Sequence, residues 1–116
     1  MPNRQKILIL ENDDFLREII GNLLHKKGGY ILNGFSVEDG LSDAQGHHIN
    51  TVIIGSSCPD FKGKETLKYI KKQLGTIDAD FFVINDGAKI ISGIDKDQQM
   101  KTSELSIEKI LKRISV

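Results

Sequence analysis

Short apolar runs alternate along this chain with amphipathic stretches, and this alternation constrains the fold more than any other feature. Residues 6–10, 51–54 and 81–84 are almost continuously apolar and rich in β-branched or aromatic side chains, which is typical of strands buried on both faces. Between them, apolar residues recur at helical spacing, as in the stripe over residues 15–24. The repeated order of strand and helix predicts an α/β domain with a parallel sheet, right-handed crossovers and helices on both faces.

Capping residues indicate where the helices begin. Asp13 or Asp14 can cap the first helix, and Ser36 can cap a second helix that Gly40 loosens. The predicted strands span residues 6–10, 30–35, 51–54 and 81–84, and the predicted helices run from 14 to about 27, from 37 to about 44, from 64 to about 74 and from about 106 to 114.

The stretch after the fourth predicted strand allows two interpretations. Residues 85–87 are typical of a tight hairpin turn, and residues 88–94 are apolar enough for a strand or a single helical turn. Residues 95–99 are too polar for a central strand but suit an edge. A shrunken helix followed by an edge strand and a hairpin that replaces both therefore remain open.

The composition indicates a single globular domain, residues 1–116. Sixteen basic residues balance sixteen acidic ones, which gives no electrostatic preference for nucleic acid or an anionic membrane. Lys68, Lys71 and Lys72 form a local patch, which we interpret as a solvated helix face. A single cysteine excludes an internal disulfide, and no apolar run is long enough for a membrane span or a signal peptide, so we expect a cytoplasmic protein without membrane insertion.

Two of the predicted strands end in loops that should meet. An acidic cluster, residues 11–14, follows the first strand, and Gly55 begins the polar loop after the third. The carboxyl ends of parallel strands share one edge of the sheet, where α/β proteins place their sites. The acidic cluster therefore faces a position that carries no side chain.

Three segments in this order and spacing resemble the receiver domain of two-component response regulators. Residues 6–20 form an apolar strand, an acidic cluster, an arginine and an amphipathic helix, Gly29-Tyr30 opens the second strand, and residues 52–63 supply a third strand, a proline and a glycine. The resemblance covers nearly the whole chain and implies a CheY-like, flavodoxin-like doubly wound sheet of five parallel strands, in the order 2-1-3-4-5. The fourth helix should be shortened or absent, because the chain is several residues shorter than usual there.

The resemblance also implies a phosphorylation pocket, and its central residues are missing here. Receivers hold a divalent cation with an acid pair and transfer a phosphoryl group to an aspartate. With Arg17 as the anchor, Glu11 falls on the first acid, Asn12 on the second and Gly55 on the acceptor. Glycine cannot be phosphorylated, and neutral Asn12 is a poorer ligand for Mg²⁺ than a carboxylate.

The outer part of the implied pocket departs from the family as well. Receivers have a hydroxyl residue after the fourth strand, and this chain has Asn85 there. They also have a lysine followed by proline after the fifth strand. The best candidate for that lysine is Lys101, which is followed by Thr102. Gln98 and Gln99 stand near the position of a fifth-strand aromatic residue. We predict a degenerate pocket with no catalytic residue, no resident metal or other cofactor and weak or absent Mg²⁺ binding, made of Glu11, Asn12, Gly55, Asn85 and Lys101.

Two alternatives keep some pocket chemistry. In an active receiver with Mg²⁺, a displaced acid such as Asp60 would accept the phosphoryl group, although it lies five residues beyond the strand end and should miss the pocket. Glu11 and Asp13 could attract a cation weakly, although solvated carboxylates are the simpler interpretation.

A different alternative is an unrelated flavodoxin-like enzyme or small-ligand binder. It would use Cys58, but no histidine is placed by sequence to activate this thiol. Ser56 and Ser57 lack the surroundings of a hydrolase nucleophile and should bond the loop backbone. The pair His47-His48 lacks the further ligands of a metal site.

We therefore expect a pseudo-receiver domain, without enzymatic activity, that acts in two-component phosphorelay signalling by phosphorylation-independent binding of protein partners. A homodimer is one such arrangement, and neither the partner nor the pathway is specified by the residues. The expected contact surface is the rim around Glu11, Gly55 and Lys101 or the altered face at the fourth helix and fifth strand. Gly55→Asp alone should not restore phosphorylation, because Asn12 leaves the Mg²⁺ site short of a carboxylate.

Overall fold

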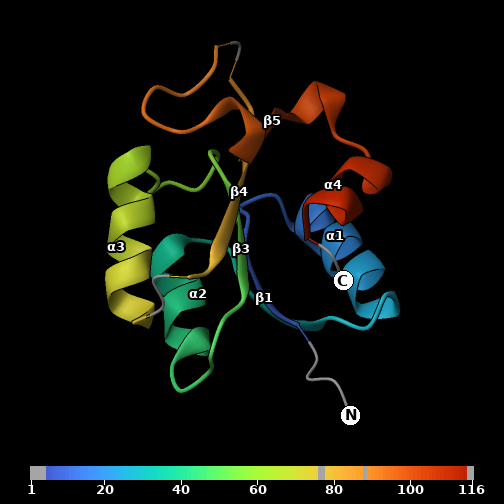
Figure 1. The fold of residues 1–116 in the computed structure, drawn as a ribbon, viewed down its shortest axis with the longest axis vertical. Coiled ribbons are helices and arrows are strands. Elements are labelled where there is room, and N and C mark those ends of the chain that lie inside the picture. The colour runs from blue at the N-terminus through green and yellow to red at the C-terminus, as the bar shows by residue number, and fades with distance from the viewer. Residues whose placement is uncertain (1–4, 76–77, 88, 115–116) are drawn as a thin grey trace.

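Five parallel strands form one sheet in the order β2-β1-β3-β4-β5, as predicted. The computed structural model describes residues 5–75, 78–87 and 89–114. Helices α2 and α3 cover one face of the sheet and α1 and α4 cover the other (Figure 1). The strands are β1 (Lys6–Leu10), β2 (Tyr30–Gly34), β3 (Thr51–Gly55), β4 (Asp80–Asn85) and β5 (Gln99–Lys101), and the helices are α1 (Asp14–Lys26), α2 (Val37–Ala44), α3 (Lys64–Leu74) and α4 (Ile107–Ile114).

The alternation of side chains along β1 divides the core into two layers. Leu8 and Leu10 pack toward α2 and α3, whereas Ile7 and Ile9 pack toward α1 and α4. All four side chains are fully buried, because β1 lies in the sheet between β2 and β3 with a helical layer on each side. This double burial explains why the strand is a continuous apolar run rather than an alternating one.

The two glycines of the β2–α2 unit permit a close approach of the helix to the sheet. A Cβ atom on Gly34 would lie only 2.5 Å from the Cα atom of Gly40, and a Cβ atom on Gly40 would overlap the Cδ2 atom of Leu10. The interpretation of Gly40 as a residue that merely loosens the helix is therefore incomplete. Its missing side chain is what lets α2 pack directly on β1 and β2.

The connection between β4 and β5 contains no α-helix in the part that the structure describes, which omits residue 88. It runs as an irregular loop into a single 3₁₀ turn, η1 (Lys96–Gln98), and a second turn, η2 (Thr102–Glu104), follows β5. Strand β5 pairs in parallel with β4, so the hairpin interpretation was wrong and an edge strand is present. Its position was not predicted, because residues 96–98 of the expected strand 95–99 form η1 and β5 begins only at Gln99. Among the described residues, no helix has the length and apolar character needed to cross a bilayer.

Candidate functional site

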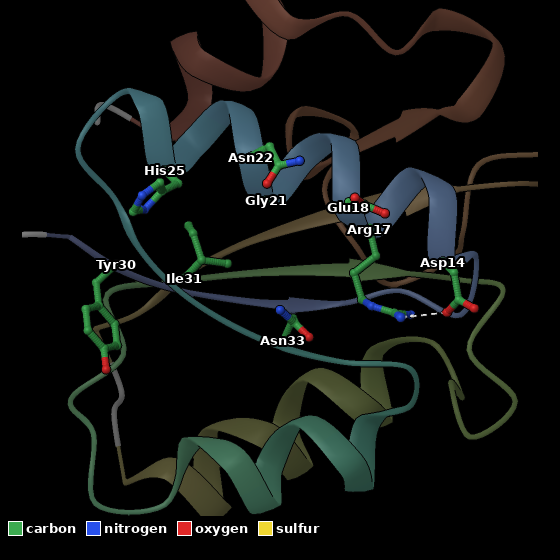
Figure 2. Close-up of a pocket in the computed structure, with 9 residues that line it drawn as sticks. All are labelled: Asp14, Arg17, Glu18, Gly21, Asn22, His25, Tyr30, Ile31 and Asn33. Carbon is green, nitrogen blue, oxygen red and sulfur yellow. Dashed lines mark hydrogen bonds and ion pairs between the residues drawn. The ribbon is translucent and has the colours of Figure 1, made fainter.

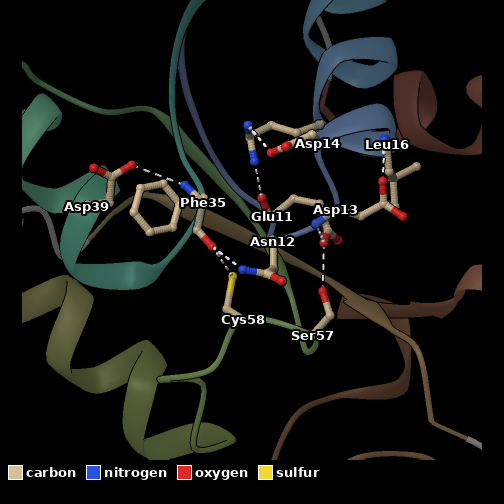
Figure 3. A network of polar contacts seen from close by, with 10 residues as sticks. Glu11, Asn12, Asp13, Asp14, Leu16, Phe35, Asp39, Ser57 and Cys58 are labelled. Atoms are coloured by element: carbon tan, nitrogen blue, oxygen red, sulfur yellow. Dashed lines mark hydrogen bonds and ion pairs between the residues drawn. The ribbon is translucent and has the colours of Figure 1, made fainter.

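The loops after β1 and β3 meet at the carboxyl edge of the sheet, as predicted (Figure 3). The loop after β4 joins them through the contact of Asp86 with Ser56. Glu11 follows β1 directly, and Gly55, the last residue of β3, pairs with Ile84 of β4. Across the next strand pair, Asn85 is opposite Lys101, the last residue of β5. The fold therefore carries the predicted pocket positions to one edge.

The Glu11 carboxylate occupies the space beside Gly55. A Cβ atom on Gly55 would lie 2.7 Å from the carboxyl carbon of Glu11, far inside van der Waals contact. Glu11 is only 2% exposed. Its Oε2 atom accepts hydrogen bonds from the Asp13 backbone N–H at 2.9 Å and from the Ser57 hydroxyl at 2.6 Å (Figure 3). The hydrogen bonds to Oε2 thus hold the buried carboxylate in place, with Oε1 nearest the position where an acceptor side chain would stand.

The neighbours of Glu11 are engaged elsewhere. The Arg17 guanidinium donates to the Glu11 backbone carbonyl at 2.7 Å and pairs with Asp14 at 2.6 Å, so it holds the start of α1 in place. The Asn12 amide donates to the Phe35 carbonyl, at 3.1 Å. The Asp13 carboxylate accepts the N–H of Leu16 and caps α1. Asp13 rather than Asp14 is therefore the cap.

These engagements leave few groups for a cation. The Asp13 carboxylate is committed to the helix cap and Asn12 contributes no charge, so Glu11 stands without an acidic partner from its own loop. Within the described residues, no group of three or more histidine, cysteine, aspartate or glutamate side chains is arranged to hold a metal ion. Weak cation binding by Glu11 and Asp13 stays a prediction.

Asn85 belongs to the β4–β5 loop. It is 3% exposed, and its amide donates to the Lys89 carbonyl at 2.7 Å while its Oδ1 atom accepts the Gly87 N–H at 2.8 Å. The Asn85 amide also lies 3.3 Å from the side-chain oxygen of Gln99. Asn85 occupies the position at which the resemblance implies a hydroxyl residue that binds the phosphoryl group. In this chain it stabilises a turn instead.

Gln99 organises the same loop, a role that the sequence did not reveal. Its side-chain oxygen accepts the Ile91 N–H at 2.8 Å, and its amide donates to the carbonyls of Ile91 at 3.1 Å and Ile94 at 2.9 Å. With the Asn85 contact, this carboxamide makes four hydrogen bonds. One glutamine therefore satisfies backbone groups that a helix would otherwise pair internally. Nothing in the local sequence signals this, because the partners are brought together only by the parallel pairing of β5.

The two serines after Gly55 bind carboxylates, and of the two only Ser56 also makes the predicted bond to the loop backbone. Ser57 donates to Glu11, and Ser56 donates to the Asp86 side chain at 2.5 Å. The Ser56 hydroxyl also accepts the Asp86 N–H at 2.9 Å. These contacts join the loop after β3 to the residues that follow β1 and β4.

Cys58 is a buried thiol with none of the features of a nucleophile. It is 3% exposed, and its Sγ atom lies 3.9 Å from the Phe35 carbonyl. Burial, followed by the negative charges of Glu11 and Asp60, raises the pKa of Cys58 to about 12. The reactive form of cysteine is the thiolate, so this geometry does not support a cysteine enzyme.

The alternative acceptor is committed to a helix. The two oxygens of the Asp60 carboxylate accept the backbone N–H groups of Val37, at 2.9 Å, and Glu38, at 3.1 Å. This long-range cap satisfies the first orphan donors of α2. Asp60 therefore points to the α2 terminus and does not join Glu11.

The histidine pair and the surface hollow of Figure 2 lie outside the Gly55 position, although one end of the hollow adjoins the Glu11 loop through Arg17. The His47 ring lies 5.8 Å from the ring of Tyr30, and its buried Nδ1 atom has no hydrogen-bond partner. A groove of about 530 Å³ runs between α1 and β2, with the Arg17–Asp14 ion pair at one end (Figure 2). Neither feature is the apolar concave pocket at the Gly55 edge that a small-ligand binder requires.

The comparisons with known proteins agree with this architecture. No protein-family model matches the chain, and no curated protein matches it. Among solved structures, a receiver domain protein from Methanospirillum hungatei JF-1 superposes with a TM-score of 0.81 at 18% identity, over 97% of this chain and 92% of that one. A receiver domain protein from Clostridium thermocellum gives 0.77 at 21%, over 96% and 91%. The receiver domain of the hybrid histidine kinase CckA gives 0.73 at 23%, over 95% of each chain.

These similarities establish the fold. The chain has the CheY-like form of the flavodoxin-like fold, with the same strand order and with helices on both faces of the sheet. At such low identity the fold carries no function by itself, so the role of the chain has to be argued from its own residues.

Proposed function

We propose that this chain is an atypical receiver domain of two-component signalling that binds protein partners without accepting a phosphoryl group. The observation that carries the proposal is the placement of the Glu11 carboxylate in the space beside Gly55. The position that needs a free nucleophile is filled by a carboxylate that is buried and hydrogen-bonded to Ser57.

The chemistry of phosphoryl transfer supports this proposal. Transfer to a carboxylate requires a nucleophile in line with the phosphoryl group and a divalent cation that neutralises its oxygens. Mg²⁺ demands near-ideal octahedral geometry with oxygen ligands. Of the pocket positions only Glu11 is acidic, and its Oε2 atom already accepts two hydrogen bonds. The role is therefore a binding role, without enzymatic activity.

The hydrogen bonds of the rim support constant binding rather than a switch. Ser56 and Ser57 tie the loop after β3 to Asp86 and Glu11, and Gln99 ties the β4–β5 loop to its own strand. A phosphoryl group usually orders such loops, and here side chains already order them. We propose that partner abundance, in a cytoplasmic phosphorelay, governs binding. A second copy of the chain is one candidate partner.

Mass measurement after acetyl phosphate treatment tests the proposal. The protein is incubated with acetyl phosphate and Mg²⁺ beside a receiver that has its acceptor aspartate, and both are weighed intact. We expect a gain of one phosphoryl group in the reference receiver alone. A stable gain in this chain would overturn the proposal, and repetition with Glu11→Gln and Asp60→Asn would then identify the acceptor.

The variant Gly55→Asp gives a second test. Its Cβ atom would meet the Glu11 carboxylate, and a second negative charge would lie against the first while Asn12 still leaves the Mg²⁺ site short of a carboxylate. We expect no phosphorylation of this variant. Phosphorylation after this single change would show that the pocket is intact apart from its acceptor, contrary to our account.

A further inference from the structure

Helix α3 carries a concentration of positive charge in a chain whose formal charge is zero. Its eleven residues include four lysines and one glutamate, a net charge of +3. The rest of the chain therefore carries a net charge of −3. We call the four exposed lysines the lysine face: Lys64, Lys68, Lys71 and Lys72.

The lysine face forms no ion pair with the described residues. In the part of the chain that the structure describes, Arg17–Asp14 is the one ion pair, so no carboxylate lies within 4 Å of these ammonium groups. Glu65, the acid of the helix, borders a hollow that residues of α2 also line. The Lys71 ammonium lies 5.4 Å from the centre of the Phe81 ring, so the side of α3 that carries Lys71 faces β4.

Two features of the lysine face work against the helix that carries it. Lys64 and Lys68, and again Lys68 and Lys72, are like charges four residues apart, a spacing that destabilises a helix. Lys64 is also the first residue of α3, where the positive end of the helix dipole disfavours a cation. Lys71 and Lys72, in the last turn, are favourably placed. Glu65, three residues before Lys68, is the one acid of α3 at an interacting spacing, and a single carboxylate leaves most of the repulsion among the four lysines in place.

The fold leaves this flank open. The β4–β5 connection, which in a parallel sheet usually contains a helix, is a loop here. Its contact with α3 is at the first turn, where a Cβ atom on Gly93 would lie 2.6 Å from the Lys64 side chain. The stripe from Lys64 to Lys71 is about 10 Å long at 1.5 Å per residue. Three or four residues of an extended chain match that length.

We propose that the lysine face of α3 binds a short acidic segment of a partner protein, and this inference rests on the proposed binding role. Acidic side chains along such a segment would relieve the repulsion at Lys68 and pair with Lys64 and Lys71. A protein segment fits better than a nucleic acid or a membrane surface, because the charge of −3 outside α3 opposes a long polyanion.

Fluorescence anisotropy with a labelled octapeptide of alternating glutamate and serine tests the proposal. The triple variant Lys64→Gln/Lys68→Gln/Lys71→Gln should bind this probe roughly tenfold more weakly, because it loses three exposed ion pairs whose effects on the dissociation constant multiply. A matched control changes three other exposed lysines to glutamine, Lys26, Lys27 and Lys112, and alters the net charge equally. We expect less than a twofold change in this control.

Three outcomes would overturn the proposal: no binding of the acidic peptide at low salt, equal losses in the two triple variants, or tighter binding of a short DNA duplex or of phosphatidylserine vesicles. Glutamine has nearly the helix propensity of lysine, so the urea midpoint of the α3 variant should be unchanged or raised. A lowered midpoint together with lost binding would assign the lysines a stabilising role instead. Acetyl phosphate treatment stays a separate test, since phosphorylation would refute the proposed function and leave the peptide result standing.

Discussion

The substitution Gly55→Ala tests the central feature of the site with a single methyl group. Gly55 lies within strand β3, so the backbone accepts alanine without strain. The added Cβ atom would be 2.7 Å from the carboxyl carbon of Glu11, so the carboxylate has to move. It would then lose the hydrogen bonds from the Ser57 hydroxyl, at 2.6 Å, and the Asp13 N–H, at 2.9 Å.

The loss of these two bonds sets the size of the effect. Hydrogen bonds to a charged group contribute about 1.5–3 kcal/mol each, and alanine returns up to about 1 kcal/mol by restricting the unfolded chain. Part of the lost bonding is recovered from water, because the displaced carboxylate can reach solvent at the sheet edge. We expect Gly55→Ala to lower the free energy of unfolding by about 2–4 kcal/mol.

Urea unfolding of four proteins measures the effect as a double-mutant cycle: wild type, Gly55→Ala, Glu11→Ala and the double variant. In the Glu11→Ala background the methyl group has space, so its cost should fall by at least about 1.5 kcal/mol. Gly21→Ala is the matched control, because its Cβ atom would meet Ile31 at 3.7 Å and Ile9 at 3.8 Å, both ordinary contacts. Equal costs of Gly55→Ala in the two backgrounds would refute the placement of Glu11.

Three further predictions concern the packing around this edge. Gly40→Ala should destabilise the protein by about 1–3 kcal/mol in urea unfolding, because its Cβ atom would overlap Leu10; an unchanged midpoint would contradict the packing described. Asp60→Ala should cost about 1–2 kcal/mol by removing the two hydrogen bonds from Val37 and Glu38, while Ser36 still caps α2, and it should not change the acetyl phosphate result. A variant as stable as the wild type would show that the Asp60 contacts contribute nothing. Native Cys58 should resist iodoacetamide at about pH 8 and react after unfolding, and rapid alkylation of the native protein would refute its burial. The free energy of unfolding should also fall as pH rises from 9.0 toward 12, because the thiol ionises at lower pH in the unfolded chain than in the folded protein.

Much of the fold follows from local patterns in the sequence. The continuous apolar run of β1 requires helical layers on both faces, and the stripe through Ile20 and Leu24 supplies one of them. Crossover handedness and short connections then leave few arrangements of the strands. The order 2-1-3-4-5, which the resemblance to receiver domains implies, was confirmed. The absence of a side chain at Gly55 and the shortened β4–β5 connection are also visible in the sequence alone.

The sequence by itself thus determined the sheet, its two helical layers and the list of residues at its carboxyl edge. Only the tertiary structure decided what those residues do, because their contacts join positions far apart in the chain. Ser57 reaches Glu11 across 46 positions, and Asp60 caps α2 from 23 positions away. Local propensity has no information on such pairs, since hydrogen-bond geometry depends on strand register and on the space that neighbours leave. Gly55 shows the difference: the sequence records an absent side chain, and the structure shows the Glu11 carboxylate in its place.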